Sequence, residues 1–267
     1  MRILPDAPMG KPIKVVAKTF KVIELLKSEN GLSLMDLAVQ ASLPKPTAYR
    51  ILDTLAGLGY IEQDPTTHRF SLGSRFLTFI RNSRPGTDII SLAEPYMERL
   101  GKVYGETVNL ARLIDEQIIY IRILESGHSF RISNNIGDRA SVHSTAIGKA
   151  IAAFLPKEEL SGVLRRNVYT PFTRKTITDE ASLRKHLALV RKQGYAVDDE
   201  EGHDGVLCVG APIFNKEHLP FAALSISMPK VRAKEKVLRT MVCEIPKLAI
   251  QLSLDLGVAD IRKCFGN

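Results

Sequence analysis

Residues 33–60 read SLMDLAVQASLPKPTAYRILDTLAGLGY, a stretch that predicts two short helices joined by a tight turn. The first predicted helix has an apolar face at helical spacing, made of Leu34, Leu37 and Ala38. The second has a longer apolar face, made of Ala48, Ile51, Leu52, Leu55 and Leu58. Pro44 and Pro46 fall near the start of the second helix, where a missing backbone N–H costs little. Gly57 and Gly59 end it, as is common at the carboxyl end of a helix.

The opposite face of the second predicted helix is polar and carries Lys45, Thr47, Tyr49, Arg50 and Thr54. Lys and Arg suit phosphates and guanine edges, and Thr and Tyr suit phosphate and base contacts. This layout is typical of a helix-turn-helix, whose second helix enters the major groove of DNA. Two amphipathic helices of any small bundle would give the same pattern, so the flanking residues decide between the two interpretations.

The flanking residues favour a winged helix-turn-helix. A preceding helix is expected over residues 13–28, with an apolar stripe made of Val16, Phe20, Ile23 and Leu26. Residues 60–62 and 69–72 are predicted as two short strands, and turn-forming residues lie between them. The tip of this hairpin, with His68 and Arg69, is expected to lie along the minor groove or the DNA backbone.

The composition is that of an ordinary soluble protein, with 45% hydrophobic and 25% charged residues in a chain of 267. This length is enough for two domains, each with its own core. No apolar run is long enough to span a bilayer, and the N-terminus lacks the apolar region of a signal peptide. Three widely spaced cysteines, Cys208, Cys243 and Cys264, form neither a CxxC pair nor a zinc-finger pattern. We therefore expect a reduced, cytoplasmic protein without a membrane partner.

The positive charge is concentrated near the N-terminus. Residues 1–84 contain 12 Lys and Arg and 7 Asp and Glu, an excess of five, whereas residues 85–267 contain 25 and 22, an excess of three. A clustered basic excess is the electrostatic footprint of a phosphate-backbone partner. A solvated basic face is the alternative for any single arginine in this region.

The remainder of the chain predicts an α+β fold. Residues 1–11 are expected to be a mobile tail, residues 76–84 a helix, Pro85 and Gly86 a boundary, and residues 88–104 a connecting helix that Pro95 kinks. The strands expected after it cover residues 107–114, 118–125, 130–134, 195–198, 206–214 and 220–228. The helices expected there are 145–154, a short one from 156, 178–193 capped by Thr178, and 234–256. One antiparallel sheet with helices packed on it accommodates these elements.

Several separate motifs, in order, resemble the IclR family of bacterial transcription regulators. They are LPKPTAYRILDTLAGLGYIE at 43–62, FSLG at 70–73, HSTAIGKA at 143–150, and GYAVDDEE at 194–201 followed by Gly205, Cys208 and Pro212. The resemblance covers nearly all of the chain, and HSTAIGKA with RKTIT at 174–178 is similar to members that sense sugar-acid breakdown products. Family members usually have a serine where this chain has Pro46, so operator details do not carry over.

The resemblance implies a particular division of the chain. It implies a winged helix-turn-helix at 12–75, linker helices at 76–104 and a GAF-like effector-binding domain at 105–262. It also implies a homodimer joined through the DNA-binding domains, and often a dimer of dimers. Double-stranded operator DNA and a small organic-acid effector are the expected partners, and no cofactor is expected.

Pairing the strands 206–214 and 220–228 as a hairpin locates a candidate ligand site. A turn at residues 215–218 pairs Cys208 with Ser225, and strand alternation puts Ser225 and Ser227 on the face of Cys208. Two unpaired small polar groups on a core-facing surface invite a hydrogen-bonding ligand. A core serine often bonds its own strand, and a buried cysteine is usually a small hydrophobe, so each residue also has a structural interpretation.

A small carboxylate fits this face. The segment at 144–148 would start a helix, and the free N–H groups there favour an anion. Keto or hydroxyl oxygens would then lie near Asp198 and Cys208. In the family that this chain resembles, the matching positions line the effector site, and here they are Ala146, Ile147, Asp198, Cys208, Ser225 and Ser227.

An enzyme is the alternative from another class. Cys208 could act as a nucleophile with His143 or His203 as base, or these three residues could bind a metal. No nucleophile elbow supports the first possibility, and the spacing is not diagnostic of the second. We therefore predict no enzyme and no metal site, but a repressor that binds a palindromic operator and releases it when a keto or sugar acid binds. The helix at 88–104 is expected to transmit this change between the domains.

Overall fold

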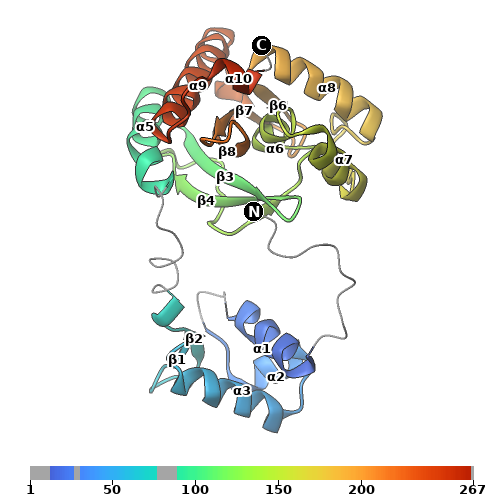
Figure 1. Ribbon diagram of the computed structural model, residues 1–267. Helices are drawn as coiled ribbons and strands as arrows, with labels where there is room; N and C mark the ends of the chain where they lie inside the picture. Colours follow the sequence, from blue (N-terminus) through green and yellow to red (C-terminus); the bar gives the residue numbers. More distant parts are fainter. Residues whose placement is uncertain (1–12, 27–30, 77–88, 266–267) are drawn as a thin grey trace. The chain divides into compact units, whose positions relative to one another are not determined.

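The computed structural model describes residues 13–26, 31–76 and 89–265, and it has the predicted α+β fold (Figure 1). The chain divides into two compact units, Met1–Gly86 and Thr87–Asn267. The predicted tail, the Pro85–Gly86 boundary and the helix predicted at 76–84, except for its first residue, lie outside the described residues. The finer domain boundaries drawn from the sequence stay predictions.

The N-terminal unit has the predicted winged helix-turn-helix. Its elements are α1 (Lys14–Leu25), α2 (Leu34–Ala41), α3 (Lys45–Gly57), β1 (Ile61–Gln63) and β2 (Phe70–Leu72). Ser33 caps α2, because its hydroxyl accepts the Asp36 N–H while the Asp36 carboxylate accepts the Ser33 N–H. Ser42 adopts a left-handed conformation, with φ of 56°, and ends this helix. Pro46 lies in the first turn of α3, as predicted.

The core of this unit corrects the stripe predicted for its first helix. Val16 and Phe20 are 47% and 60% exposed, whereas Val22 and Leu26 are buried. These buried residues pack with Leu37, Ala41, Ile51, Leu52, Leu55, Ile61 and Phe70. The predicted stripe was therefore wrong at its N-terminal end, because the residues of this segment that join the core, Val22, Ile23, Leu25 and Leu26, all lie at the C-terminal end of α1. Leu58, predicted on the inner face of α3, is also exposed, since the helix has ended at Gly57.

The C-terminal unit is a six-stranded antiparallel sheet with helices on both faces. Its strands are β3 (Thr107–Ile114), β4 (Gln117–Leu124), β5 (Arg139–Ala140), β6 (Ala196–Asp199), β7 (Val206–Phe214) and β8 (Pro220–Pro229), in the order β5-β4-β3-β8-β7-β6. Its helices are α5 (Ile89–Tyr104), α6 (Ala146–Ala152), α7 (Lys157–Arg166), α8 (Glu180–Gln193), α9 (Glu235–Asp255) and α10 (Arg262–Phe265), with a 3-10 turn at Lys230–Arg232.

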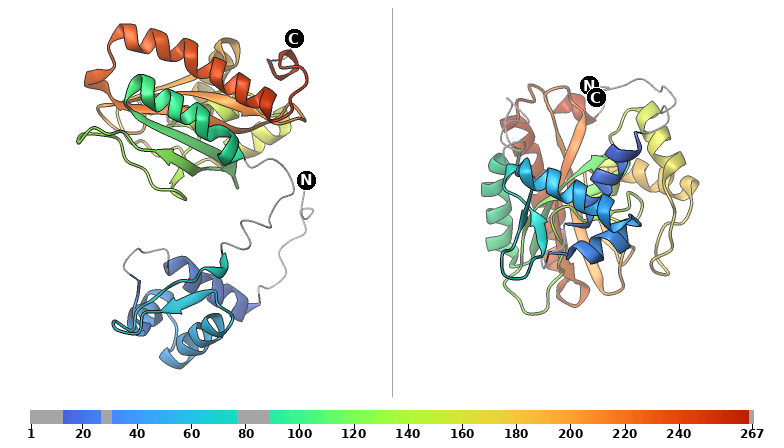
Figure 2. Two further views of the ribbon diagram at one scale, coloured as in Figure 1. Left: turned by 90° about the vertical axis from the view of Figure 1, so that its left-hand side faces the viewer. Right: turned by 90° about the horizontal axis from the view of Figure 1, so that it is seen from below.

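Two apolar layers lie on opposite faces of this sheet. Figure 2 shows α5 and α9 side by side over one face, where they share a core with β7 and β8. Helix α6 packs on the other face against β7, and α8 packs on α6. The helix predicted as a connector, α5, buries Ile89, Ala93, Met97 and Leu100 in the first layer. No helix of the described residues is long and apolar enough to cross a membrane.

Two local predictions in this unit were wrong, and one helix was missed. Residues 130–134 form no strand; side chains of Thr107 and Arg232 donate to the Ile132 and Phe130 carbonyls there, and the edge strand is β5 instead. The cap of α8 is Asp179 rather than Thr178, because the Asp179 carboxylate accepts the Ser182 N–H. Helix α10 was not predicted.

The β7–β8 hairpin forms with a pairing two residues away from the predicted one. Cys208 pairs with Ser227 rather than Ser225, and Gly210 pairs with Ser225. A register irregularity at Ile213 and Phe214 and a five-residue turn, in which the Asn215 N–H donates to the Leu219 carbonyl, cause the difference. A shift of two leaves every side chain on its predicted face.

At Gly148, helix α6 packs closely against the preceding segment. A Cβ at this position would lie 2.6 Å from both Cα and O of Val142. We expect Gly148→Ala to reduce the free energy of unfolding by about 1–3 kcal/mol through overpacking, measured by urea denaturation. Gly162→Ala on α7 is the matched control, because the added methyl meets only the end of the Arg166 side chain at 3.3 Å. Equal stability of the two variants would contradict the close-packing argument.

Candidate functional site

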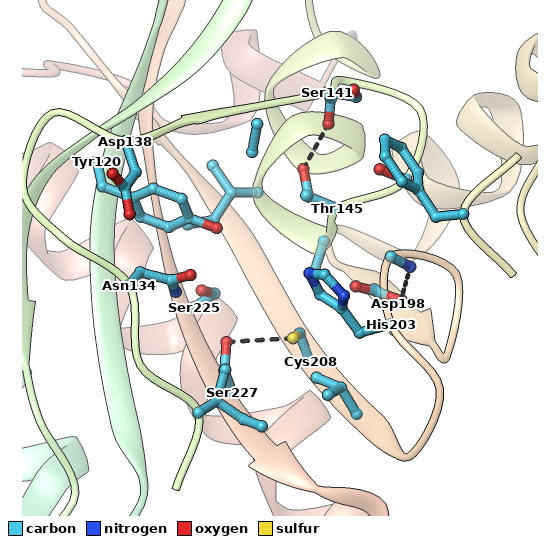
Figure 3. A pocket seen from close by; sticks show the side chains of 18 of the residues that line it. Tyr120, Asn134, Asp138, Ser141, Thr145, Asp198, His203, Cys208, Ser225 and Ser227 are labelled. Atoms are coloured by element: carbon cyan, nitrogen blue, oxygen red, sulfur yellow. Dashed lines mark hydrogen bonds between the residues drawn. The ribbon is translucent and has the colours of Figure 1, made fainter. Parts of the chain in front are cut away.

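A cavity of about 350 Å³ opens between the start of α6 and the small-residue face of the sheet (Figure 3). Its walls come from β4, β7 and β8, the segment that leads from β4 into α6, and the turn after β6. All the residues predicted from the sequence to contact an effector line it: Ala146, Ile147, Asp198, Cys208, Ser225 and Ser227. The structure therefore brings together residues that lie up to 81 positions apart in the chain, from Ala146 to Ser227.

The two serines on the floor of the cavity are held from beneath by a buried asparagine that the sequence interpretation missed. Asn109 on β3 is fully buried, and its Nδ2 lies 3.1 Å from Ser227 Oγ and 3.4 Å from Ser225 Oγ. The Cys208 thiol also donates to Ser227 Oγ, at 3.1 Å (Figure 3). The expectation that both serines are unpaired was thus wrong. A polar residue inside the apolar run TVNLARLI was the available signal.

The start of α6 forms the wall beside this floor. Thr145 Oγ1 accepts the Gly148 N–H at 3.1 Å and donates to the Ser141 carbonyl at 2.9 Å. Ala146 and Ile147 are the first residues of the helix, where backbone N–H groups have no intrahelical acceptor. A Cβ at Gly210 would lie 3.1 Å from the carbonyl carbon of Ala146, so glycine permits β7 to approach the helix.

Asp198 places a carboxyl group at the edge of the cavity. Its Oδ1 accepts the Glu201 N–H at 2.7 Å and the Gly202 N–H at 3.4 Å, which folds the turn after β6. Burial raises the pKa of Asp198 above its usual value, although these hydrogen bonds and Lys149 oppose the effect. The carboxyl group is therefore poorly solvated and can gain from a ligand hydroxyl.

A buried ion pair fixes the same turn and was not anticipated from the sequence. Lys149 on α6 is fully buried, and its Nζ donates to the Val197 carbonyl at 2.7 Å and to the Glu201 carboxylate. Burial raises the pKa of Glu201, and the charge of Lys149 opposes that increase. Gly202 and His203, which follow in the turn, line the cavity. A lysine within the apolar run AIGKAIAAF was the available signal.

The residues considered for catalysis are arranged unlike a catalytic site. Burial, and then the charge of Asp198, raise the pKa of the Cys208 thiol, which favours the protonated form over a nucleophilic thiolate. Both ring nitrogens of His143 have partners at 3.1 Å, the Thr170 carbonyl and the Asn167 amide. Of the two histidines considered as a base for Cys208, His203 lines the cavity and His143 does not. In residues 13–26, 31–76 and 89–265, no three His, Cys, Asp or Glu side chains are grouped to hold a metal.

The residues predicted to contact DNA lie on one helix and at the hairpin. Lys45, Tyr49, Arg50 and Thr54 are exposed on α3, and Thr47 is half-buried. The Thr54 hydroxyl donates to the Arg50 carbonyl at 2.7 Å, so its proton stays within the helix. Arg69 is exposed next to β2, and its Nη1 donates to the Gly31 carbonyl at 3.0 Å. Arg69 thus also fastens the hairpin to the segment before α2, a role that the sequence did not indicate.

Comparison with known proteins identifies the class of protein. The family models "IclR helix-turn-helix domain" and "Bacterial transcriptional regulator IclR C-terminal" match residues 15–65 and 84–254. The chain is 31% identical over 248 residues to the HTH-type transcriptional regulator KdgR of Escherichia coli K12, which covers 93% of this chain and 94% of that protein. It is 32% identical over 261 residues to the transcriptional repressor IclR of the same bacterium, covering 94% and 93%. The crystal structure of Thermotoga maritima IclR superposes with a TM-score of 0.76 at 28% identity, covering 92% of this chain and 100% of that chain.

This chain belongs to the IclR family of bacterial transcriptional regulators, as its sequence motifs predicted. It is a DNA-binding transcriptional regulator, and family members bind operator DNA and small-molecule effectors. The relatives named above are regulators rather than enzymes, so they do not support the alternative of a metal- or thiol-dependent enzyme with a DNA-binding head.

Proposed function

We propose that this regulator is a cytoplasmic repressor that binds a palindromic operator as a homodimer and releases it when a small keto or sugar acid binds. The single observation that supports ligand binding is the cavity, because all six residues that the sequence analysis proposed as effector contacts line it. The transcriptional repressor IclR of Escherichia coli supports the sign of regulation. The ligand can act only if it binds two arrangements of the protein with different affinity.

The proposed DNA contacts are Lys45, Thr47, Tyr49, Arg50 and Thr54 on α3, with Arg69 at the hairpin. The exposed face of α3 presents a lysine, an arginine and a tyrosine, which suit phosphates and base edges in the major groove. The exposed Val16 and Phe20 of α1 support the homodimer, because a second copy would remove them from water. Ala146, Ile147, Asp198, Cys208, Ser225 and Ser227 are the proposed effector contacts.

The variant Arg50→Ala tests the proposed DNA contacts of α3. We expect this variant to bind operator DNA about 10- to 100-fold more weakly, because a groove contact by arginine contributes about 1–3 kcal/mol. A gel-shift titration measures it, with a duplex that the wild-type protein selects from a random-sequence pool. Arg239→Ala is the control, since it removes the same charge from an exposed position on α9 in the other unit. Equal affinity of the two variants would remove Arg50 from the contact surface.

A further inference from the structure

Asn109 is held in one orientation beneath the cavity. It pairs across the sheet with Ser225, so both side chains lie on the same face. Its Oδ1 accepts from Asn134 Nδ2 at 3.3 Å, which directs the Asn109 Nδ2 toward the two serines. The serines are therefore hydrogen-bond acceptors toward the sheet.

The hydrogen-bond capacity of each hydroxyl then decides what it can offer a ligand. A serine hydroxyl has one proton and two acceptor positions. Ser227 Oγ accepts from Asn109 and from the Cys208 thiol, which fills both acceptor positions and leaves only its proton. Ser225 Oγ accepts from Asn109 and keeps its proton as well. Both hydroxyls line the cavity, so both protons are available to a ligand.

We propose that Asn109 is a positioning residue that makes the floor of the cavity a donor surface and thereby selects ligands with a carboxylate or carbonyl oxygen. The Asp198 carboxyl, on another wall, accepts a ligand hydroxyl. The ligand class is accordingly a carboxylic acid that carries a hydroxyl or keto group. An ammonium at the position of the carboxylate is disfavoured, because Ser227 has no free acceptor position for it and Ser225 has only one. This inference rests on the proposed effector function of the cavity and names the polarity that the ligand must have.

The test compares acids with amines of the same carbon skeleton. The probes are lactate with 1-amino-2-propanol, gluconate with glucamine, and 4-hydroxybenzoate with 4-hydroxybenzylamine, titrated calorimetrically into the full-length protein. The variants are Asn109→Asp, which accepts from the serines instead of donating, and Asn109→Leu, which does neither. Ser253→Ala is the control, because Ser253 is a buried serine in α9 whose hydroxyl bonds the Ala249 carbonyl and the Phe214 N–H, away from the cavity.

The wild-type protein is expected to bind at least one acid and to prefer it to its amine. Asn109→Asp should weaken binding of that acid by roughly 100-fold, because the Ser225 and Ser227 hydroxyls would donate to the new carboxylate instead of to the ligand. The preference for the acid over its amine should become smaller or invert. Asn109→Leu should narrow the preference by roughly 10-fold, and Ser253→Ala should leave it unchanged. A purely structural role would weaken acid and amine equally, so an unchanged preference in both Asn109 variants would overturn the inference. Failure of every probe to bind the folded wild-type protein would instead overturn the proposed effector function.

Discussion

Lys149→Met is expected to lower the free energy of unfolding of the C-terminal unit by about 3–5 kcal/mol, because it leaves a buried carboxylate without its cation. Glu201 is nearly fully buried, and its Oε2 has no hydrogen-bond partner in the described part of the chain. Lys149 therefore provides the main compensation for this charge. Urea denaturation of the full-length protein, followed by hydrogen exchange in α6, measures the loss.

Two further variants show whether the ion pair itself is responsible. Lys149→Met with Glu201→Gln removes both charges and should recover more than half of the loss, since a neutral pair carries no uncompensated ion. Lys175→Met is the matched control, because Lys175 pairs with Asp199 and Glu200 at the surface, where an ion pair contributes about 0–1 kcal/mol. If Lys149→Met and Lys175→Met unfolded at the same urea concentration, the buried pair would not stabilise this unit.

The double variant Ser225→Ala/Ser227→Ala is expected to lose its response to the effector while it keeps its affinity for DNA. Each hydroxyl can donate to a charged ligand oxygen, and such a hydrogen bond contributes about 1.5–3 kcal/mol, so the pair corresponds to a loss of more than about 100-fold. Alanine preserves the shape of the floor. The measurement is the concentration of a stabilising acid that releases operator DNA in a gel shift.

The DNA affinity of the same double variant is the internal control. The serines lie in the C-terminal unit, whereas the proposed DNA contacts lie in the N-terminal unit, so DNA binding without ligand should match that of the wild-type protein. Release of DNA from the double variant at the wild-type ligand concentration would show that the effector binds elsewhere.

Elements with a strong local signal could be predicted from the sequence. The two helices α2 and α3, with Pro46 in the first turn of α3 and Gly57 at its end, and the two strands β7 and β8 follow from local spacing, and the structure has them at the expected residues. Cys208, Ser225 and Ser227 could be chosen because a strand has only two faces and the composition of those faces differs, whereas Ala146, Ile147 and Asp198 were positions that the family resemblance implied.

The remainder depended on contacts between distant residues. Nothing in the spacing of α1 distinguishes Val16 and Phe20 from Val22, because which face is buried depends on where α2 and α3 lie. Asn109 and Lys149 are polar residues within apolar runs, and their partners lie 118 and 52 positions away, at Ser227 and Glu201. Such pairs are visible only once the sheet and α6 are assembled.

The hairpin of β7 and β8 has a consequence for how this protein can change in evolution or by design. A pairing two residues away from the observed one would leave every side chain on its present face, so the cavity would keep its chemistry. A step of one would turn Ser225 and Ser227 toward the apolar layer under α5 and α9 and would turn Leu224 and Ile226 toward the cavity. An insertion in the turn at residues 215–219 therefore leaves the cavity intact only if β7 and β8 still pair in a register that differs from the present one by an even number of residues. The proposed ligand site therefore depends on the two-residue periodicity of the β-strand as well as on the identity of the residues that line the cavity.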